Sequence, residues 1–283
     1  MKFNLCIIRP EGYAHADAFW ELTELLAYSL RDLGHDAHIS INEYGKDFHN
    51  IVFGGHLLGE SSVNALPEST IIFNTEQLYM EENSWNTRVF QLGQRLRIWD
   101  YSARNIERLE VEGCGRTALV PIGYHRRLER IEKQRNQNID VLFYGSRNPR
   151  RTKILKELSD RGLVVQSLFG VYGAQRDEYV SRSKLVLNIH RSDAQIFEVV
   201  RAHYLVNNQI PVVCEINPTT RIDDCWSEIV TGVAYDQLAD RCVELVADQP
   251  TREREAAEAL ERLKLWPQEN IMTELLRHSA MVG

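Results

Sequence analysis

The sequence lacks the features that mark several large classes of protein. Only five cysteines occur among its 283 residues, at positions 6, 114, 214, 225 and 242, and no two of them form a CxxC pair. This usage argues against a disulfide-stapled scaffold and favours free thiols in a reducing compartment. No apolar run approaches the ~20 residues that a membrane span needs, and no secretory leader pattern opens the chain. We therefore expect a cytoplasmic protein without a membrane span.

Charge of one sign is not in large excess either. The net charge is −7, with 43% hydrophobic and 26% charged residues, as in an ordinary globular protein. Because nucleic-acid-binding proteins usually carry a broad basic surface, we expect no nucleic-acid partner.

Several catalytic motifs are also missing. The chain contains no GxGxxG or Walker loop and no GxSxG elbow, which disfavours a dehydrogenase, a P-loop enzyme and a serine hydrolase. It has nine histidines but no HxH, HExxH or clustered Cys and His. The sequence therefore predicts no metal site and no bound cofactor.

What the sequence does contain is an alternation of short apolar runs with amphipathic segments. Such alternation predicts an α/β fold whose parallel sheet is covered by helices. We expect strands at 3–8, 36–41, 51–53, 70–73, 96–99 and 118–120, and then at 139–144, 163–168, 184–189 and 211–215. We expect helices from 18 to 33, from Pro149 to about Arg161, and at 176–183, 196–207, 251–265 and 267–281.

A charged segment at 126–138, with few apolar residues, divides the chain. We interpret it as an exposed linker, which predicts domains at 1–128 and 139–266, each within the usual size range. An alternative is that its five basic residues form a nucleic-acid-binding strip, but a solvated linker is the simpler interpretation.

Ligands of open parallel sheets bind outside the carboxyl ends of the strands. In the first half, the residues that follow predicted strands include Gly12, Tyr13, His15, His56 and Glu76. In the second half they are 145–151, 169–173, 190–197 and 215–220. Each of His15, His56 and His190 is a candidate for contacting a ligand, although a structural hydrogen bond is the simpler role for at least two of them.

The turn at 145–151 places three arginines where a strand passes into a helix. Cations are unfavourable at a helix N-terminus unless an anion is bound there, so we predict a diphosphate site. Arg147 is the first choice because it is nearest the strand, and Arg150 and Arg151 are expected to point to solvent. The alternative is a solvated turn whose arginines pair with nearby acidic residues.

Glu198 and Arg201 are spaced to share one face of the helix predicted at 196–207. They form either a surface ion pair or a site in which the carboxylate accepts ribose hydroxyls and the guanidinium reaches phosphate.

At this point the sequence resembles the group 1 glycosyltransferases of the GT-B fold, in particular an uncharacterised bacterial group. In the second half the similarity covers 141–147, 168–170, 179–190, 197–201 and 210–213, and in the first half 99–102, 119–124, Gly12-Tyr13 and Gly54-Gly55-His56. The resemblance implies two Rossmann-like domains that face each other across a cleft, with the last segment, 267–283, packing back on the first. The sequence departs from the family in one respect, because the family has two glutamates eight residues apart. Eight residues after Glu198 lies Val206, and Tyr204 lies where the second glutamate would fall relative to the strand at 211–213.

The resemblance implies a metal-independent, retaining transfer of a sugar from a nucleotide-sugar donor to an acceptor that the sequence does not identify. We predict His15 and Glu198 as catalytic, and His56 and Glu76 on the acceptor side. The predicted donor-binding residues are Gly12, Tyr13, Gly145, Ser146, Arg147, Arg151, Phe169, Gly170, Tyr172, His190, Phe197 and Arg201.

Two alternatives remain, a nucleotide-sugar epimerase and a non-catalytic binding module. Transfer of a sugar onto modified DNA is a third, which the negative net charge disfavours. The chain is short for this architecture, so a partner or a homodimer is one way to complete the cleft.

Overall fold

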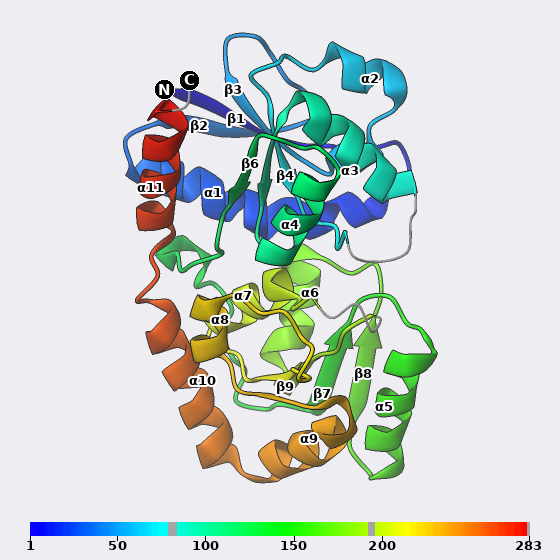
Figure 1. Ribbon diagram of the computed structural model, residues 1–283. Coiled ribbons are helices and arrows are strands. Elements are labelled where there is room, and N and C mark those ends of the chain that lie inside the picture. The colour runs from blue at the N-terminus through cyan, green and yellow to red at the C-terminus, as the bar shows by residue number, and fades with distance from the viewer. Residues whose placement is uncertain (79–83, 192–195, 282–283) are drawn as a thin grey trace. The chain divides into compact units, whose positions relative to one another are not determined.

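The computed structural model describes residues 1–78, 84–191 and 196–281 (Figure 1). The chain separates into two compact units, one made of Met1–His125 with Pro267–Gly283 and the other of Arg126–Trp266. The predicted loop 190–197 and the predicted C-terminal segment 267–283 each include residues that lie outside the described ranges.

The first unit is built on a six-stranded parallel sheet, in the order β2-β1-β3-β4-β5-β6. Its strands are β1 (Lys2–Ile7), β2 (Asp36–Ile41), β3 (His49–Phe53), β4 (Ile71–Asn74), β5 (Arg97–Asp100) and β6 (Thr117–Leu119). Its α-helices are α1 (Trp20–Asp32), α2 (Glu60–Ala65), α3 (Ser84–Arg95), α4 (Ala103–Val111) and α11 (Gln268–Met281), and its 3-10 helices are η1 (Ala14–Phe19) and η2 (Gly55–Leu57).

The second unit is built on a five-stranded parallel sheet, in the order β11-β10-β9-β7-β8. Its strands are β7 (Ile139–Tyr144), β8 (Val165–Leu168), β9 (Ser183–Asn188), β10 (Val212–Glu215) and β11 (Gly232–Val233). Its α-helices are α5 (Pro149–Asp160), α6 (Gly173–Ser181), α7 (Val199–Asn207), α8 (Asp224–Ile229), α9 (Leu238–Ala247) and α10 (Gln249–Leu263), with 3-10 helices η3 (Arg126–Leu128) and η4 (Tyr235–Gln237).

Both faces of the second sheet are covered by helices. Val141 and Phe143 of β7 point into a core shared with α5 and α9, whereas Leu142 between them points into a core with α6 and α7. A strand that is buried on both faces reads as a continuous apolar run, which is why 139–144 was recognisable in the sequence. The prediction of a parallel α/β fold is therefore confirmed.

Local sequence fixes the start of α5. The side chain of Asn148 accepts a hydrogen bond from the backbone N–H of Arg151, and Pro149 occupies the first helical turn. The first backbone N–H groups of a helix have no acceptor within the helix. The Asn side chain supplies one, and Pro has no N–H that needs one. The predicted start of this helix is confirmed, and it fixes the position of the arginines that follow β7.

The segment 126–138 is not simply an exposed linker. Leu128 is fully buried, and the backbone N–H groups of Arg130 and Ile131 both donate to Asn208 Oδ1, at 2.7 and 2.8 Å. Most residues of this segment are exposed, as expected, and the expectation fails at Leu128 and at the backbone groups that bond Asn208.

Helix α7 begins at Val199, three residues later than predicted. Ile196 instead forms an isolated β-bridge with Arg221. Helices α2, α3, α8 and α9 were not predicted. In α9 the signal was present, because its buried residues Leu238, Cys242 and Leu245 recur at helical spacing.

Candidate functional site

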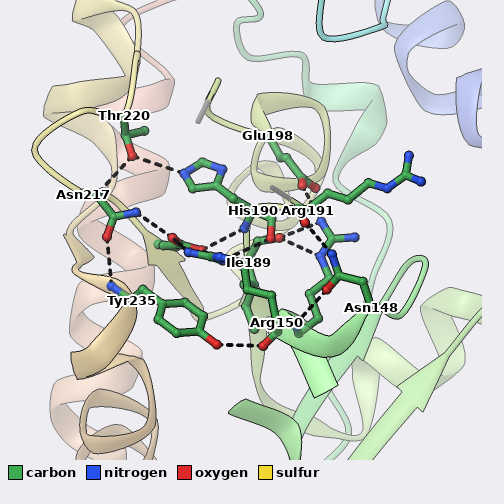
Figure 2. A network of polar contacts seen from close by, with 11 residues as sticks. Asn148, Arg150, Ile189, His190, Arg191, Glu198, Asn217, Thr220 and Tyr235 are labelled. Carbon is green, nitrogen blue, oxygen red and sulfur yellow. Dashed lines mark hydrogen bonds and ion pairs between the residues drawn. The ribbon is translucent and has the colours of Figure 1, made fainter. Parts of the chain in front are cut away.

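The carboxyl ends of β7, β9 and β10 are neighbours in the second unit, and the strand ends, loops and helix starts at this edge carry a dense polar network (Figure 2). The network has two layers. One contains Arg151, Glu198 and Arg201, and the other contains Arg150 and Glu215.

In the first layer, two guanidinium groups share one carboxylate. Glu198 forms an ion pair with Arg151 through one oxygen and with Arg201 through the other. Arg151 also donates to the Ile189 carbonyl, from Nε at 3.1 Å and from Nη2 at 2.6 Å. Arg201 donates from Nη1 to Asn188 Oδ1 at 2.7 Å, and among the described residues its buried Nε finds no acceptor.

These guanidinium groups lie over the first residue after β7. Gly145 has φ +135°, and a Cβ atom there would be 3.0 Å from Arg201 Nη2 and 3.8 Å from Arg151 Nη1. The Phe143 ring lies beneath both groups, with the guanidinium carbons of Arg151 and Arg201 at 5.4 and 5.9 Å from its centroid. A side chain at residue 145 would crowd Arg201, and φ +135° is a backbone conformation that residues other than glycine rarely adopt.

The layer carries more positive than negative charge. Burial lowers the pKa of Arg151, and Arg201, Arg191 and Arg150 lower it further against the opposing effect of Glu198. For Glu198, burial opposes ionisation, but Arg201 and Arg151 outweigh it and lower the pKa of the carboxyl. Glu198 is therefore ionised, and one negative charge faces two positive ones. A buried surplus of this kind favours binding of an anion.

The second layer is a closed ion pair. Glu215 is fully buried, and Arg150 binds it with two nitrogens, one of them Nη1 at 2.6 Å from Oε2. The same carboxylate accepts from the His190 backbone N–H at 3.0 Å and from Asn217 Nδ2 at 2.6 Å. The Arg150 guanidinium carbon lies 3.9 Å from the centroid of the Tyr235 ring, and the Tyr235 hydroxyl donates a hydrogen bond to the Arg150 carbonyl. The second layer therefore ties the start of α5 and the His190 backbone to the end of β10.

The expectation that Arg150 and Arg151 point to solvent was wrong. The side chain of Arg151 is 3% exposed, whereas Arg147, the first choice, is exposed and donates from Nε to Ser167 Oγ at 3.0 Å. In a helix N-terminal turn, successive side chains point in different directions, and the third arginine of the stretch faces the sheet edge. Ser146 contributes its carbonyl, which accepts from Arg151 Nη1 at 3.0 Å.

The other predicted residues of this unit lie around the network in different environments. His190 is buried, its Nε2 is 3.2 Å from Thr220 Oγ1, and burial lowers its pKa, so the ring is neutral near pH 7. Phe197 is buried against Trp226. Phe169 is 62% exposed beside Gly170, and Tyr172 precedes α6.

The predicted residues of the first unit gather at the carboxyl edge of its own sheet. His56 Nε2 lies 3.5 Å from Glu76 Oε1, and burial lowers the pKa of His56 to about 4. Burial and the charge of Glu76 raise the pKa of Tyr13, whose ring contacts that of His15. Gly12 precedes them at φ +75°.

Sequence reasoning did not single out Glu215 or Asn188. Each is the last residue of a buried strand, and a polar residue at that position of a continuous apolar run was the available signal. It also did not assign Asp100 a firm role, although Asp100 is fully buried at the end of β5.

None of the helices within the described residues is long and apolar enough to cross a membrane. In the same part of the chain, no three His, Cys, Asp or Glu side chains are grouped so that they could hold a metal ion.

Comparison with known proteins places this chain by its fold. It matches no family model. Two sequence relatives come from Acanthamoeba polyphaga mimivirus. The uncharacterized protein R358 is 27% identical over 65% of this chain and 67% of its own length. The uncharacterized protein L140 is 27% identical over 76% of this chain and 72% of its own length. The expected bacterial subgroup finds no support in these viral relatives.

Solved structures of glycosyltransferases share the fold. HepE of Anabaena in complex with UDP and glucose aligns with a TM-score of 0.60 at 11% identity over 99% of this chain and all of that one. AviGT4, a glycosyltransferase involved in avilamycin A biosynthesis, aligns with a TM-score of 0.56 at 17% identity. The alignment covers 98% of this chain and 96% of AviGT4. TarM aligns at 0.56 and 12% identity over 89% of this chain, which spans only 57% of TarM. The chain therefore has the α/β fold of the GT-B glycosyltransferases, with one Rossmann-like sheet in each unit.

Proposed function

We propose that this protein is a glycosyltransferase that takes its sugar from a nucleoside diphosphate sugar bound on the second unit. The observation that carries the proposal is the pair Arg151 and Arg201, which share Glu198 over Gly145 at the carboxyl edge of the sheet. This edge is where ligands of open α/β sheets bind, and planar guanidinium groups match the oxygens of a diphosphate. HepE, which shares the fold, binds UDP and UDP-glucose.

The chemistry follows from the charge. In the transfer, the bond between the anomeric carbon and the diphosphate oxygen breaks, and an acceptor oxygen bonds to that carbon while losing its proton. Negative charge grows on the departing diphosphate. Guanidinium groups that are already fixed beside it therefore stabilise the transition state more than the ground state. Glu198 holds the two guanidinium groups in place before the nucleoside diphosphate sugar binds.

The finer features are proposals as well. Because the arginines supply the positive charge that a metal ion would otherwise supply, we propose that the transfer needs no metal. We keep retention of configuration, His15 as a residue near the reacting sugar, and the first unit as the acceptor side as parts of the same proposal.

Thermal unfolding with UDP, GDP and ADP tests the donor site. A ligand that binds only the folded state stabilises it by RT ln(1 + [L]/Kd), which is about 2.7 kcal/mol at a hundredfold excess over Kd. At least one nucleotide should raise the melting temperature. If none does so at millimolar concentration, the donor site is not there.

Nucleotide release from UDP-sugars, measured with and without EDTA, then tests the activity. A transferase or a slow hydrolase releases UDP, and EDTA should not change the rate. An epimerase changes the sugar without releasing UDP, and a pure binding module does neither. Release that depends on added Mg²⁺ or Mn²⁺ would contradict the metal-independent mechanism.

A further inference from the structure

Guanidinium groups and tyrosine rings alternate in a line that starts at the proposed diphosphate site and continues between α6 and α7. We call this line the cation–ring stack, and its members in order are Arg201, Tyr144, Arg176, Tyr204 and Arg130. The Tyr144 ring centroid lies 5.4 Å from the guanidinium carbon of Arg201 and 5.8 Å from that of Arg176. The Tyr204 ring centroid lies 4.5 Å from the Arg176 carbon and 5.4 Å from the Arg130 carbon. Because a cation at about this distance over a ring is attracted to it, each contact of the stack is favourable.

The far end of the stack is buried and fixed by hydrogen bonds. Arg176 is 5% exposed and Tyr204 is 2% exposed. Asp177 Oδ1 accepts from Arg176 Nε and Nη2, at 3.0 and 2.7 Å, and Asp177 Oδ2 accepts from the Tyr204 hydroxyl at 2.7 Å. The same hydroxyl accepts from Arg130 Nε at 2.9 Å. A buried ion pair contributes little net stability, so the burial of Arg176 calls for another explanation.

The near end of the stack, Arg201, has fewer polar contacts. Its Nη1 donates to Asn188 Oδ1 and pairs with Glu198, whereas its Nε finds no acceptor among the described residues. A guanidinium that is bound through one nitrogen can still pivot about that nitrogen. The rings of Tyr144 and Phe143, which lie against it, therefore set its orientation.

We propose that the cation–ring stack positions Arg201 for the diphosphate, and that Tyr144 and Arg176 are positioning residues that do not touch the ligand. Tyr144 supports Arg201 on one side and is supported by Arg176 on the other. Arg176 is in turn fixed by Tyr204 and Asp177. A side chain that is oriented before the anion binds loses less conformational entropy on binding, which raises the affinity. This inference rests on the proposed function, because it concerns the same diphosphate site.

A double-mutant cycle, measured by titration calorimetry with UDP and with inorganic pyrophosphate, tests the role of Tyr144. Tyr144→Leu removes the ring and should lower the affinity for both anions at least fivefold, whereas Tyr144→Phe, which retains the ring, should restore it. In the Arg201→Ala background, Tyr144→Leu should change the affinity less than twofold. A residue that acts through Arg201 has nothing left to position there, whereas a general structural effect would persist.

The matched control is another pair of the same kind in the same unit. The guanidinium carbon of Arg182 lies 5.1 Å from the ring centroid of Tyr179, and neither residue belongs to the stack. Tyr179→Leu removes that ring and should keep the affinity of the parent protein for both anions.

Arg176→Met tests the far end of the stack. It removes the cation beside Tyr144, so the affinity for UDP should fall at least threefold, again only when Arg201 is present. Arg176→Lys, which keeps a cation at this position, should recover most of the loss. If Arg176→Met does not fold, the cycle at Tyr144 decides the question.

The outcomes separate this proposal from the proposed function. If Tyr144→Leu has no effect, or has the same effect with and without Arg201, the positioning role is overturned and the donor site stands. If pyrophosphate shows the expected cycle but no nucleotide binds, the positioning role stands and the proposed function falls. If neither anion binds the parent protein at millimolar concentration, both fall.

Discussion

Arg201 Nη2 lies 3.0 Å from the point where a Cβ atom on Gly145 would stand. This approach joins the end of β7 to helix α7, and a side chain at residue 145 would make Arg201 give way by a few tenths of an ångström. The position of Arg201 over the sheet edge therefore depends on a residue 56 positions earlier in the chain.

Gly145→Ala should disturb the donor site. The new methyl group would shift Arg201 by a few tenths of an ångström, and alanine at φ +135° adds strain of about 1–3 kcal/mol. We expect UDP affinity to fall at least tenfold by calorimetry. Gly113→Ala is the control, because Gly113 has φ +79° with open space around it, and it should lose stability but keep UDP affinity.

Replacing the buried arginines should weaken nucleotide binding more than replacing Arg147. Arg201→Ala removes its charge-assisted hydrogen bonds to the diphosphate, which are worth about 1.5–3 kcal/mol. Glu198 is not left unpaired in this variant, because it keeps Arg151 as its partner. Arg147→Ala, at an exposed position, should have a smaller effect. Titration calorimetry with UDP orders the variants, with Arg161→Ala, on the far end of α5, as the unaffected control. A larger loss in Arg147→Ala than in Arg201→Ala would restore the order predicted from sequence.

Glu215→Ala should destabilise the second unit strongly. It leaves Arg150 without its carboxylate and the His190 N–H without its acceptor, and breaking a buried pair costs about 3–5 kcal/mol. Urea unfolding measures the loss. Glu258→Ala, in an exposed pair with Arg254, should unfold like the parent. The double variant Glu215→Leu with Arg150→Met should recover part of the loss, and a double variant worse than Glu215→Ala would contradict a paired role.

His56 should make stability depend on pH. Burial lowers its pKa to about 4 from 6.5, so the unfolded chain binds a proton between these values and the folded chain does not. Stability is fully present above pH 6.5 and falls as the pH drops toward 4, by at most about 3 kcal/mol from this residue. His56→Gln, which does not titrate, should show a shallower decline in urea midpoints over this range. Parallel curves for the two proteins would show that His56 does not contribute.

The sequence by itself predicted the elements whose cause is local. The strand at 139–144, with its apolar run 141–144, and the Asn148-Pro149 helix start follow from burial on two faces and from capping. The pairing of Glu198 with Arg201 followed from their spacing and is present. The helix predicted around that pair began too early, because Ile196 is used in a bridge to a residue distant in sequence.

Residues whose environment depends on distant parts of the chain were not predictable in the same way. Neither the burial of Arg151 nor the role of Glu215 can be inferred from neighbouring residues, since both depend on strands β7, β9 and β10 lying side by side. In the first unit, Asp100, Asn74 and Glu76 meet for the same reason.

Local patterns of apolar and capping residues thus determined which segments became strands and helices, and that glycine and arginine would follow β7. Tertiary structure alone decided which arginine is buried, which carboxylate it meets, and which loops converge at each sheet edge. The physical reason is that burial and charge pairing depend on distance in space, and the order of strands in a parallel sheet is not their order in the sequence.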